Sequence, residues 1–423
     1  MKNISLIKNS IWMISGNMLR AAFQLLYFLL LAKSLGSYDY GLFVAMVALA
    51  TILSPISSVG FGSVLLREVS KNRNTFNELW GKSIGITIIA SVFIIMLVLI
   101  FKNFLFNSST PYAPIVVILF SELIFSKLIE INLQALQAFE KMKMVALFQS
   151  SLTFSRLIGV LIIYISGVEI NLFVWSAVYM IATLAISIIS TKYLFSSIGR
   201  ADLRFDAKIS ELKDGIYFAL GIGSQSLTLD IDKIILSKVA YSEAVGIYFA
   251  AARIIDVIYT PIRSVISAIN PTLYKNGIPG AINSITLAAK IIPMFGLYIA
   301  IVTLVFFFMK TVIIKILGES FEGADIYIIQ LLPILFFRGA FYILADILSS
   351  IDKNLLRTTI QICTAILTTF ISLYLVKNNG VQGAITGVYV TSFIALAVIV
   401  CMIVFIGNRE NRSKIAKQTD THE

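Results

Sequence analysis

Long apolar runs dominate the chain, and they constrain its fold more than any other feature of the sequence. Twelve stretches are apolar enough to form membrane-spanning helices, which need about 20 residues each. Because backbone polar groups in lipid must be satisfied within the segment, each run is predicted to be a helix. The expected fold is an all-α integral membrane protein with twelve transmembrane helices. They cover residues 9–33, 41–66, 80–101, 113–137, 144–166, 171–195, 214–237, 245–270, 285–309, 326–348, 357–376 and 384–406.

Composition excludes several other classes of protein. Of the 423 residues, 58% are apolar and 13% are charged, whereas soluble domains carry roughly 25% charged residues. The single histidine, His422, lies in the polar tail, so zinc sites and histidine-based catalysis are not expected. Cys363 and Cys401 both fall in apolar runs, where a thiol behaves as a small apolar side chain.

The basic residues predict the orientation of the chain. Of 34 lysines and arginines, 21 fall on one set of loops, 6 on the opposite set and 7 within spans. The positive-inside rule then places both termini in the cytoplasm. The net charge of +11 is therefore mostly a topology signal, and no nucleic-acid partner is expected. The longest loops, 196–213 and 310–325, are too short for a folded extramembrane domain, so function is expected within the membrane.

An internal repeat predicts two halves. A shift of 205 residues places Leu31–Ala45 on Leu236–Ala250, which pairs Lys33 with Lys238 and Gly41 with Gly246. Two six-helix halves related in this way are typical of transporters, with the substrate site between them. The expected organisation is an N-terminal half, a cytoplasmic linker, a C-terminal half and a cytoplasmic tail. Their bounds are 1–195, 196–213, 214–406 and 407–423.

Charged residues inside the spans are the candidate functional residues, because charge at bilayer depth is costly and faces the bundle interior or a water-filled cavity. Polar residues at helical spacings of 3 and 4 form one stripe along 245–270. That stripe consists of Arg253, Asp256, Thr260, Arg263, Ser267 and Asn270. The full set of intramembrane charges is Arg20, Lys127, Arg156, Lys233, Arg253, Arg263, Arg338, Glu122, Glu130, Asp230, Asp232, Asp256 and Asp346.

Seven bases against six acids favour an anionic cargo, and the planar guanidinium of arginine suits phosphate oxygens. The arginines predicted to line this cationic cavity are Arg20, Arg253, Arg263, Arg156 and Arg338. Buried carboxylates are candidates for ion coupling because burial favours proton uptake, and the best placed are Asp230, Asp232 and Asp256. Two alternatives stay open. Polar side chains can serve only as glue between helices, and Lys127–Glu130 and Asp230–Lys233 can neutralise each other at i,i+3 spacing.

Two segments resemble a known family. LAKSLGSYDYGLFVAMVALA followed by GFGSVLLREVS is similar to the first two helices of Wzx-type O-antigen flippases, polysaccharide transporters of the multidrug and oligosaccharidyl-lipid exporter superfamily. DKIILSKVAYSEAVGIYFAAARI is similar to the start of the second half in that family. The resemblance implies a V-shaped, MATE-like twelve-helix bundle. It also implies a flippase, not an enzyme, that moves undecaprenyl-diphosphate-linked oligosaccharide from the cytoplasmic to the periplasmic leaflet of a bacterial inner membrane.

Such a cargo requires sugar contacts besides the cationic cavity. The expected contacts are the amide and aromatic side chains of Asn17, Gln24, Tyr27, Gln225 and Tyr342. No cofactor is expected, and proton or sodium coupling stays open. Partners implied are the lipid-linked oligosaccharide, the bilayer, and the polymerase and chain-length regulator of lipopolysaccharide assembly.

Three competing functions remain. A cation-coupled drug exporter of the same superfamily predicts an acid-dominated site. A membrane polymerase or transferase predicts a large external loop or a nucleotide site. A flippase for lipid-linked peptidoglycan precursor predicts additional helices.

Overall fold

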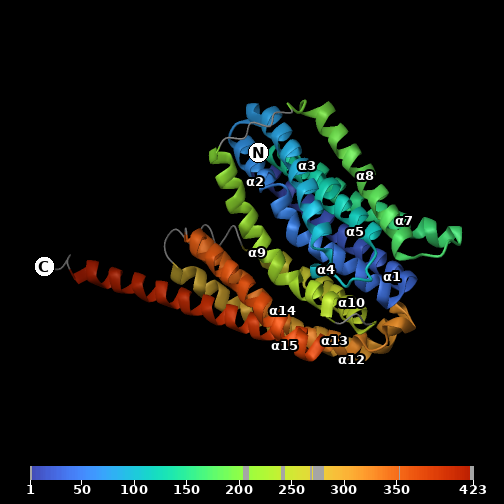
Figure 1. Ribbon diagram of the computed structural model, residues 1–423. Helices are drawn as coiled ribbons and strands as arrows, with labels where there is room; N and C mark the ends of the chain where they lie inside the picture. The colour runs from blue at the N-terminus through green and yellow to red at the C-terminus, as the bar shows by residue number, and fades with distance from the viewer. Residues whose placement is uncertain are drawn as a thin grey trace. The chain divides into compact units, whose positions relative to one another are not determined.

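A computed structural model describes residues 2–202, 209–239, 243–266, 269, 281–351 and 353–419, and every regular element in these ranges is a helix (Figure 1). The chain divides into two compact units, Met1–Gly246 and Ile247–Glu423. Ser267 and Asn270 of the predicted stripe lie outside the described residues. The predicted division at 196–213 stays a prediction, and part of that linker also lies outside them.

The first unit is a bundle around the long helix α1, which packs against α7 and α9. Its elements are α1 (Lys2–Ser57), α2 (Phe61–Lys71), η1 (Arg73–Thr75), α3 (Phe76–Ile100), α4 (Lys102–Leu105), α5 (Tyr112–Leu119), the π-helix η2 (Phe120–Ser126), α6 (Lys127–Ala138), α7 (Met142–Ser166), α8 (Leu172–Ser197) and α9 (Ile209–Val239).

The second unit is built on α12, α14 and α15, which lie side by side (Figure 1). α10 (Glu243–Ile258) begins in the first unit and runs into the second. The other elements are α12 (Ala281–Leu317), η3 (Glu319–Phe321), α13 (Ala324–Leu331), α14 (Ile334–Ser350) and α15 (Asn354–Thr419). Gly339 of α14 makes room for the packing, because a Cβ there would lie 2.9 Å from Ile262 and 3.0 Å from Phe295.

The helices match the predicted spans. Among the described residues, eight stretches are long and apolar enough to cross a membrane. Two of them, Gly16–Ser57 and Leu355–Ile406, hold two predicted spans each. The remaining predicted spans, 113–137 and 214–237, correspond to the run α5–η2–α6 and to α9. The all-α membrane fold is therefore confirmed, and the helices of the described residues are roughly consistent with twelve spans.

Glycines mark the points where long helices change direction. Gly36 in α1 and Gly380 in α15 have positive φ values of 73° and 55°, which glycine adopts without steric cost. Each interrupts a helix between two predicted spans. Val59 and Gly60 also have positive φ, so α1 ends at Ser57 and not at the predicted residue 66.

Close helix crossings in the first unit also depend on glycine. A Cβ on Gly215 of α9 would lie 2.2 Å from the carbonyl oxygen of Val59, and a Cβ on Gly246 would lie 1.8 Å from that of Ser37. Gly41 and Gly246, which the repeat places at equivalent positions, also approach closely: a Cβ on Gly41 would lie 3.1 Å from the Gly246 Cα. These glycines let backbones approach as closely as membrane helix interfaces commonly require.

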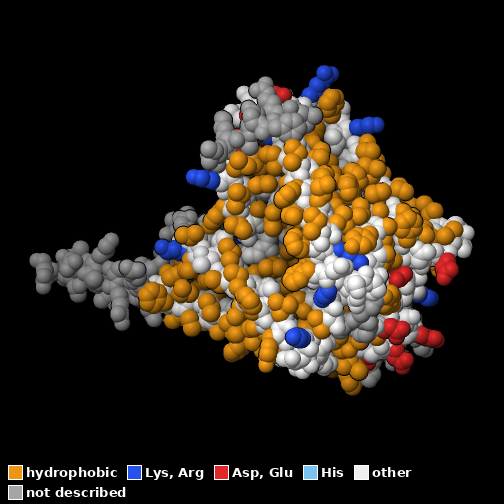
Figure 2. All heavy atoms as spheres, viewed as in Figure 1, with side chains coloured by type: hydrophobic (Ala, Val, Ile, Leu, Met, Phe, Trp, Pro, Cys, Tyr) orange, Lys and Arg blue, Asp and Glu red, His pale blue; other side chains and the backbone are white. Residues whose placement is uncertain are grey.

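The lipid-facing character of both units is visible in exposed apolar side chains. Ile89, Phe93 and Met96 of α3 are 59, 61 and 60% exposed, and Met294 and Leu297 of α12 are 64 and 65% exposed. Hydrophobic side chains form most of the surface in Figure 2. A surface of this kind is stable in lipid and would be a liability in water.

Candidate substrate-binding site

The first unit holds a largely buried ion pair between α7 and the π-helix η2. Arg156 Nη2 donates to Glu122 Oε1 at 2.7 Å, and each side chain is 15% exposed. The same nitrogen donates to Thr183 Oγ1 at 3.1 Å, and Tyr179 donates its hydroxyl to Glu122 Oε1 at 2.5 Å. Three helical elements therefore fix one carboxylate and one guanidinium.

Aromatic rings enclose this ion pair. The Arg156 guanidinium lies 4.0 Å from the centre of the Tyr179 ring. Trp175 packs on Tyr179 at 5.8 Å and on Tyr27 at 5.5 Å, measured between ring centres. Phe43 contacts both Trp175 and Tyr179 edge-on. Arg156, a predicted cavity arginine, and Tyr27, a predicted sugar contact, thus both belong to a packed and neutralised cluster.

Other intramembrane charges of the first unit are also paired. Lys127 Nζ lies 2.9 Å from Glu130 Oε2, and Lys233 pairs with Asp230, as the i,i+3 spacings suggested. Asp232 is buried, with 5% of its surface exposed. Lys127 is 6% exposed at its side chain, so this pair protects a buried cation.

The remaining predicted residues of the first unit lie on two helices that pack together. Arg20, Gln24 and exposed Asn17 are on α1, and half-buried Gln225 is on α9. Arg20 and Gln24 are half-buried. Their roles as phosphate or sugar contacts stay predictions.

The second unit contains a more open ion pair. Arg338 Nη1 of α14 donates to Asp256 Oδ1 of α10 at 3.1 Å, and the two side chains are 18 and 42% exposed. The Arg338 guanidinium also lies 5.3 Å from the centre of the Tyr259 ring. Tyr259 is buried, and its ring packs against this guanidinium.

Arg253 and Arg263 differ from the arginines above. Among the residues that the structure describes, neither has an ion-pair partner within 4.0 Å. Arg253 is half-buried on α10, one turn before Asp256, and Arg263 is exposed on the helical continuation that ends at Ile266. Within the described part of the chain, the stripe predicted from the sequence therefore carries two uncompensated cations.

Further polar groups of the second unit lie along α14. Asp346 Oδ1 pairs with Arg357 at 3.1 Å, and Arg357 also donates to Ser349 at 2.7 Å. Tyr342, a predicted sugar contact, is half-buried on α14, and it lies in electrostatic range of the Tyr259 hydroxyl together with Arg263 and Asp346.

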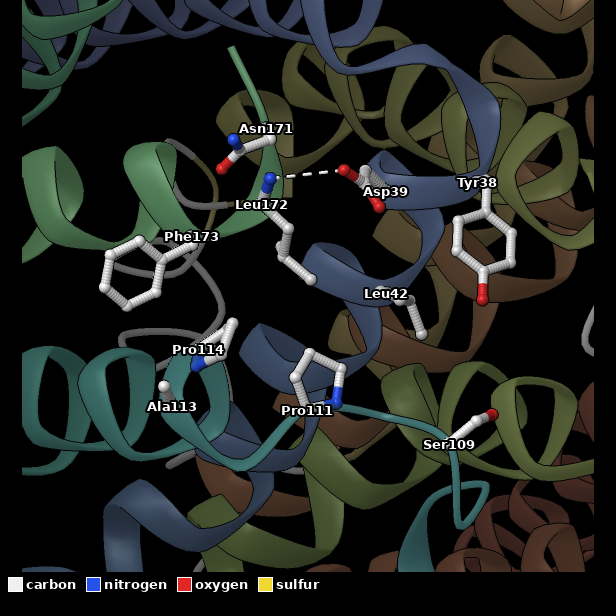
Figure 3. A pocket seen from close by; sticks show the side chains of 10 residues that line it. All are labelled: Tyr38, Asp39, Leu42, Ser109, Pro111, Ala113, Pro114, Asn171, Leu172 and Phe173. Carbon is white, nitrogen blue, oxygen red and sulfur yellow. Dashed lines mark hydrogen bonds between the residues drawn. The ribbon is translucent and has the colours of Figure 1, made fainter.

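A separate pocket of about 290 Å³ lies in the first unit at the end predicted to be external (Figure 3). Asp39 Oδ2 accepts a hydrogen bond of 3.1 Å from the Leu172 backbone N–H, and Asn171 caps the same helix through Val174. Pro111 and Phe173 complete its apolar wall. Its size is at the low end for ligand pockets, so it does not suit a whole lipid-linked repeat unit.

An ion-pair network at the edge of the spans joins α2 to the start of α9. Arg67 Nη2 lies 2.5 Å from Asp214 Oδ2, and Arg67 Nε lies 2.7 Å from Glu68 Oε1. The hydrogen bond to Asp214 raises the pKa of Arg67. The hydrogen bond from Arg67 lowers the pKa of Glu68.

The fold resembles solved transporters along its whole length. An inward-facing multidrug-resistance MATE-family transporter of the MOP superfamily matches with a TM-score of 0.73 and 15% identity, covering 94% of this chain and 98% of that one. A MOP-superfamily transporter from Pyrococcus furiosus, described as having a binding pocket of reverse polarity, matches at 0.64 and 16%, covering 95 and 96%. The lipid II flippase MurJ matches at 0.66 and 14%, covering 93 and 87%.

These structures define the class: a MATE-like fold used by membrane transporters and flippases. The chain belongs to the polysaccharide biosynthesis protein family, whose model matches residues 6–276. No curated protein matches the sequence. At the level of family and fold, the expectation of a MATE-like membrane protein of a polysaccharide biosynthesis family is confirmed.

Proposed function

We propose that the protein is a flippase that moves undecaprenyl-diphosphate-linked repeat units of O-antigen, or of a similar surface polysaccharide, from the cytoplasmic to the periplasmic leaflet by alternating access. Membership in a polysaccharide biosynthesis family supports the sugar cargo. The chain also shares the fold of the lipid II flippase MurJ, which supports a lipid-linked cargo. The positive-inside pattern supports a multi-pass protein of the bacterial inner membrane with both termini in the cytoplasm.

The observation that carries the proposal is the pair of arginines on α10 and its continuation, Arg253 and Arg263, which lack an acidic partner among the described residues. A cation at bilayer depth is costly, so the site is most stable when an anion occupies it. A diphosphate supplies several acceptor oxygens in the geometry that guanidinium groups bind best. The lipid tail can stay in the bilayer while the headgroup occupies the polar site.

The membrane potential favours the same direction of transport. Moving one elementary charge across the membrane is worth about 2.3 kcal/mol per 100 mV. With a negative cytoplasm, outward movement of an anionic headgroup is downhill. Asp230, Asp232 and Asp256 remain the candidates for coupling to a proton or sodium ion.

A drug exporter on the same fold is the competing function. Such a protein needs carboxylates that are not already paired to bind a cationic drug, but both acids in the spans of the second unit have arginine partners. Asp256 is bound by Arg338 and Asp346 by Arg357. The charge left over in this unit favours an anion.

The proposal is tested by flipping in proteoliposomes that hold undecaprenyl diphosphate N-acetylglucosamine, with its appearance in the outer leaflet detected by a lectin. Wild-type protein is expected to move the lipid. Arg253→Ala combined with Arg263→Ala should slow movement at least tenfold, because each charge-assisted hydrogen bond is worth about 1.5–3 kcal/mol. Lys192→Ala is the matched control, since Lys192 is exposed at the end of α8.

Two results would contradict the proposal. The first is flipping at the wild-type rate by the double arginine variant. The second is no flipping by wild-type protein that instead exports a cationic dye such as rhodamine 6G.

A further inference from the structure

Asp256 occupies an unusual place for an acid, next to the arginines of a site for an anion. We infer that Asp256 is a placeholder for substrate phosphate: it neutralises Arg338 in the empty site, and a diphosphate displaces it. This inference rests on the proposed function and adds a specificity-determining residue to it. It also makes Arg338 a third phosphate ligand beside Arg253 and Arg263.

The geometry of the Arg338–Asp256 pair suits an exchangeable contact. Its 3.1 Å separation is longer than the roughly 2.7–2.9 Å of strong charge-assisted hydrogen bonds. Arg338 is only 18% exposed, whereas Asp256 is 42% exposed. The carboxylate can therefore turn away while the guanidinium stays in place over the Tyr259 ring.

Neighbouring charges would hold the incoming anion near Arg338. Arg253 lies one helical turn before Asp256 on α10, and Arg263 lies two turns after it. Arg263 and Arg338 both lie in electrostatic range of the Tyr259 hydroxyl. Asp346 is the other acid in this range, but its side chain is 10% exposed and held by Arg357.

Exchange of Asp256 for a diphosphate keeps Arg338 paired both with and without substrate. A guanidinium that is 18% exposed is modestly more stable beside a counter-charge than without one, so Arg338 gains from a partner when no substrate is bound. A carboxylate on the open side supplies that partner. Because Asp256 competes with the substrate, it weakens binding and favours release, as a carrier requires after each cycle.

The test is equilibrium binding of undecaprenyl diphosphate to the full chain in nanodiscs. Asp256→Asn should raise the affinity roughly tenfold, a typical size for the coupling between two linked groups. Arg338→Ala should lower the affinity, and adding Asp256→Asn to Arg338→Ala should bring no further gain. Asp346→Asn is the matched control, because it removes one acid from the same unit and should change the affinity less than about twofold.

The outcomes separate this inference from the proposed function. Unchanged or weaker binding by the folded Asp256→Asn variant overturns the placeholder role, even where Arg253 and Arg263 prove essential. An equal gain from Asp346→Asn also overturns it, because the effect is then general electrostatics. If wild-type protein binds neither undecaprenyl diphosphate nor its monophosphate, the proposed function itself fails. A monodisperse elution profile verifies that each variant is folded.

Discussion

The two units use the same ion-pair chemistry in different surroundings. In the first unit, Arg156 and Glu122 are 2.7 Å apart, both 15% exposed, and joined by Thr183 and Tyr179. In the second, Arg338 and Asp256 are 3.1 Å apart and the acid is 42% exposed. An enclosed pair with extra hydrogen bonds fixes helices in place, whereas an open pair can exchange its partner.

The intramembrane charges divide between the units in the same way. The first unit contains four of the predicted bases and four of the acids, and the second contains Arg253, Arg263 and Arg338 against two acids. The excess of positive charge therefore lies entirely in the second unit. A balanced set of charges stabilises helix packing, and only the unbalanced set has reason to attract an anion.

The comparison predicts its largest effect for Glu122→Gln. Removing one member of a buried pair leaves an uncompensated charge, so the free energy of unfolding should fall by about 3 kcal/mol. Asp256→Asn should change it by less than about 1 kcal/mol, as expected for a partly exposed pair. Unfolding in a detergent series measures both values. Equal stability losses for the two variants would contradict the difference between an enclosed ion pair in the first unit and an open one in the second.

A second prediction concerns the tight packing of the first unit. Gly215→Ala should destabilise it by about 1–3 kcal/mol through overpacking, because the new Cβ would lie 2.2 Å from the Val59 carbonyl oxygen. Gly223→Ala on the same helix is the control, since nothing lies within 4 Å of its Cβ position. Alanine should be neutral or stabilising there because it favours helix more than glycine. Melting temperatures that rank the two variants in the opposite order would refute this packing.

The smallest expected effect is a pH dependence at the α2–α9 network. The hydrogen bond from Arg67 lowers the pKa of Glu68 below its ordinary value. The stabilisation is therefore present above the ordinary pKa of a glutamate and lost as pH falls through the lowered pKa. Wild-type protein should lose slightly more melting temperature than Glu68→Gln between pH 6 and pH 3. A variant with the same pH profile as wild type would show that Glu68 contributes nothing.

The sequence predicts some of these features well because they are local. Apolar runs predict the spans, and i,i+3 spacing predicts the pairs Lys127–Glu130 and Asp230–Lys233. The polar stripe along 245–270 is also the source of the proposal for Arg253 and Arg263, since helical spacing places them on one face.

Contacts between distant helices could not be predicted. Glu122 and Arg156 are 34 positions apart on different elements, and no spacing rule reports on such pairs. The packing of Trp175 and Tyr179 around this ion pair also joins residues that are distant in the sequence, so it could not be predicted either. The π-helix that carries Glu122 also leaves no trace in a pattern with a period of 3.6 residues. These features depend on how helices pack, which single-sequence periodicity does not encode.

The most direct test of the central claim compares charge removal in the two units. Binding of undecaprenyl diphosphate in nanodiscs is measured for Arg253→Met with Arg263→Met and for Lys127→Met with Glu130→Gln. We predict a loss of about 100-fold for the second-unit variant and less than about twofold for the first-unit variant. Equal losses, or a loss confined to the first unit, would contradict the claim that Arg253 and Arg263 recognise the cargo.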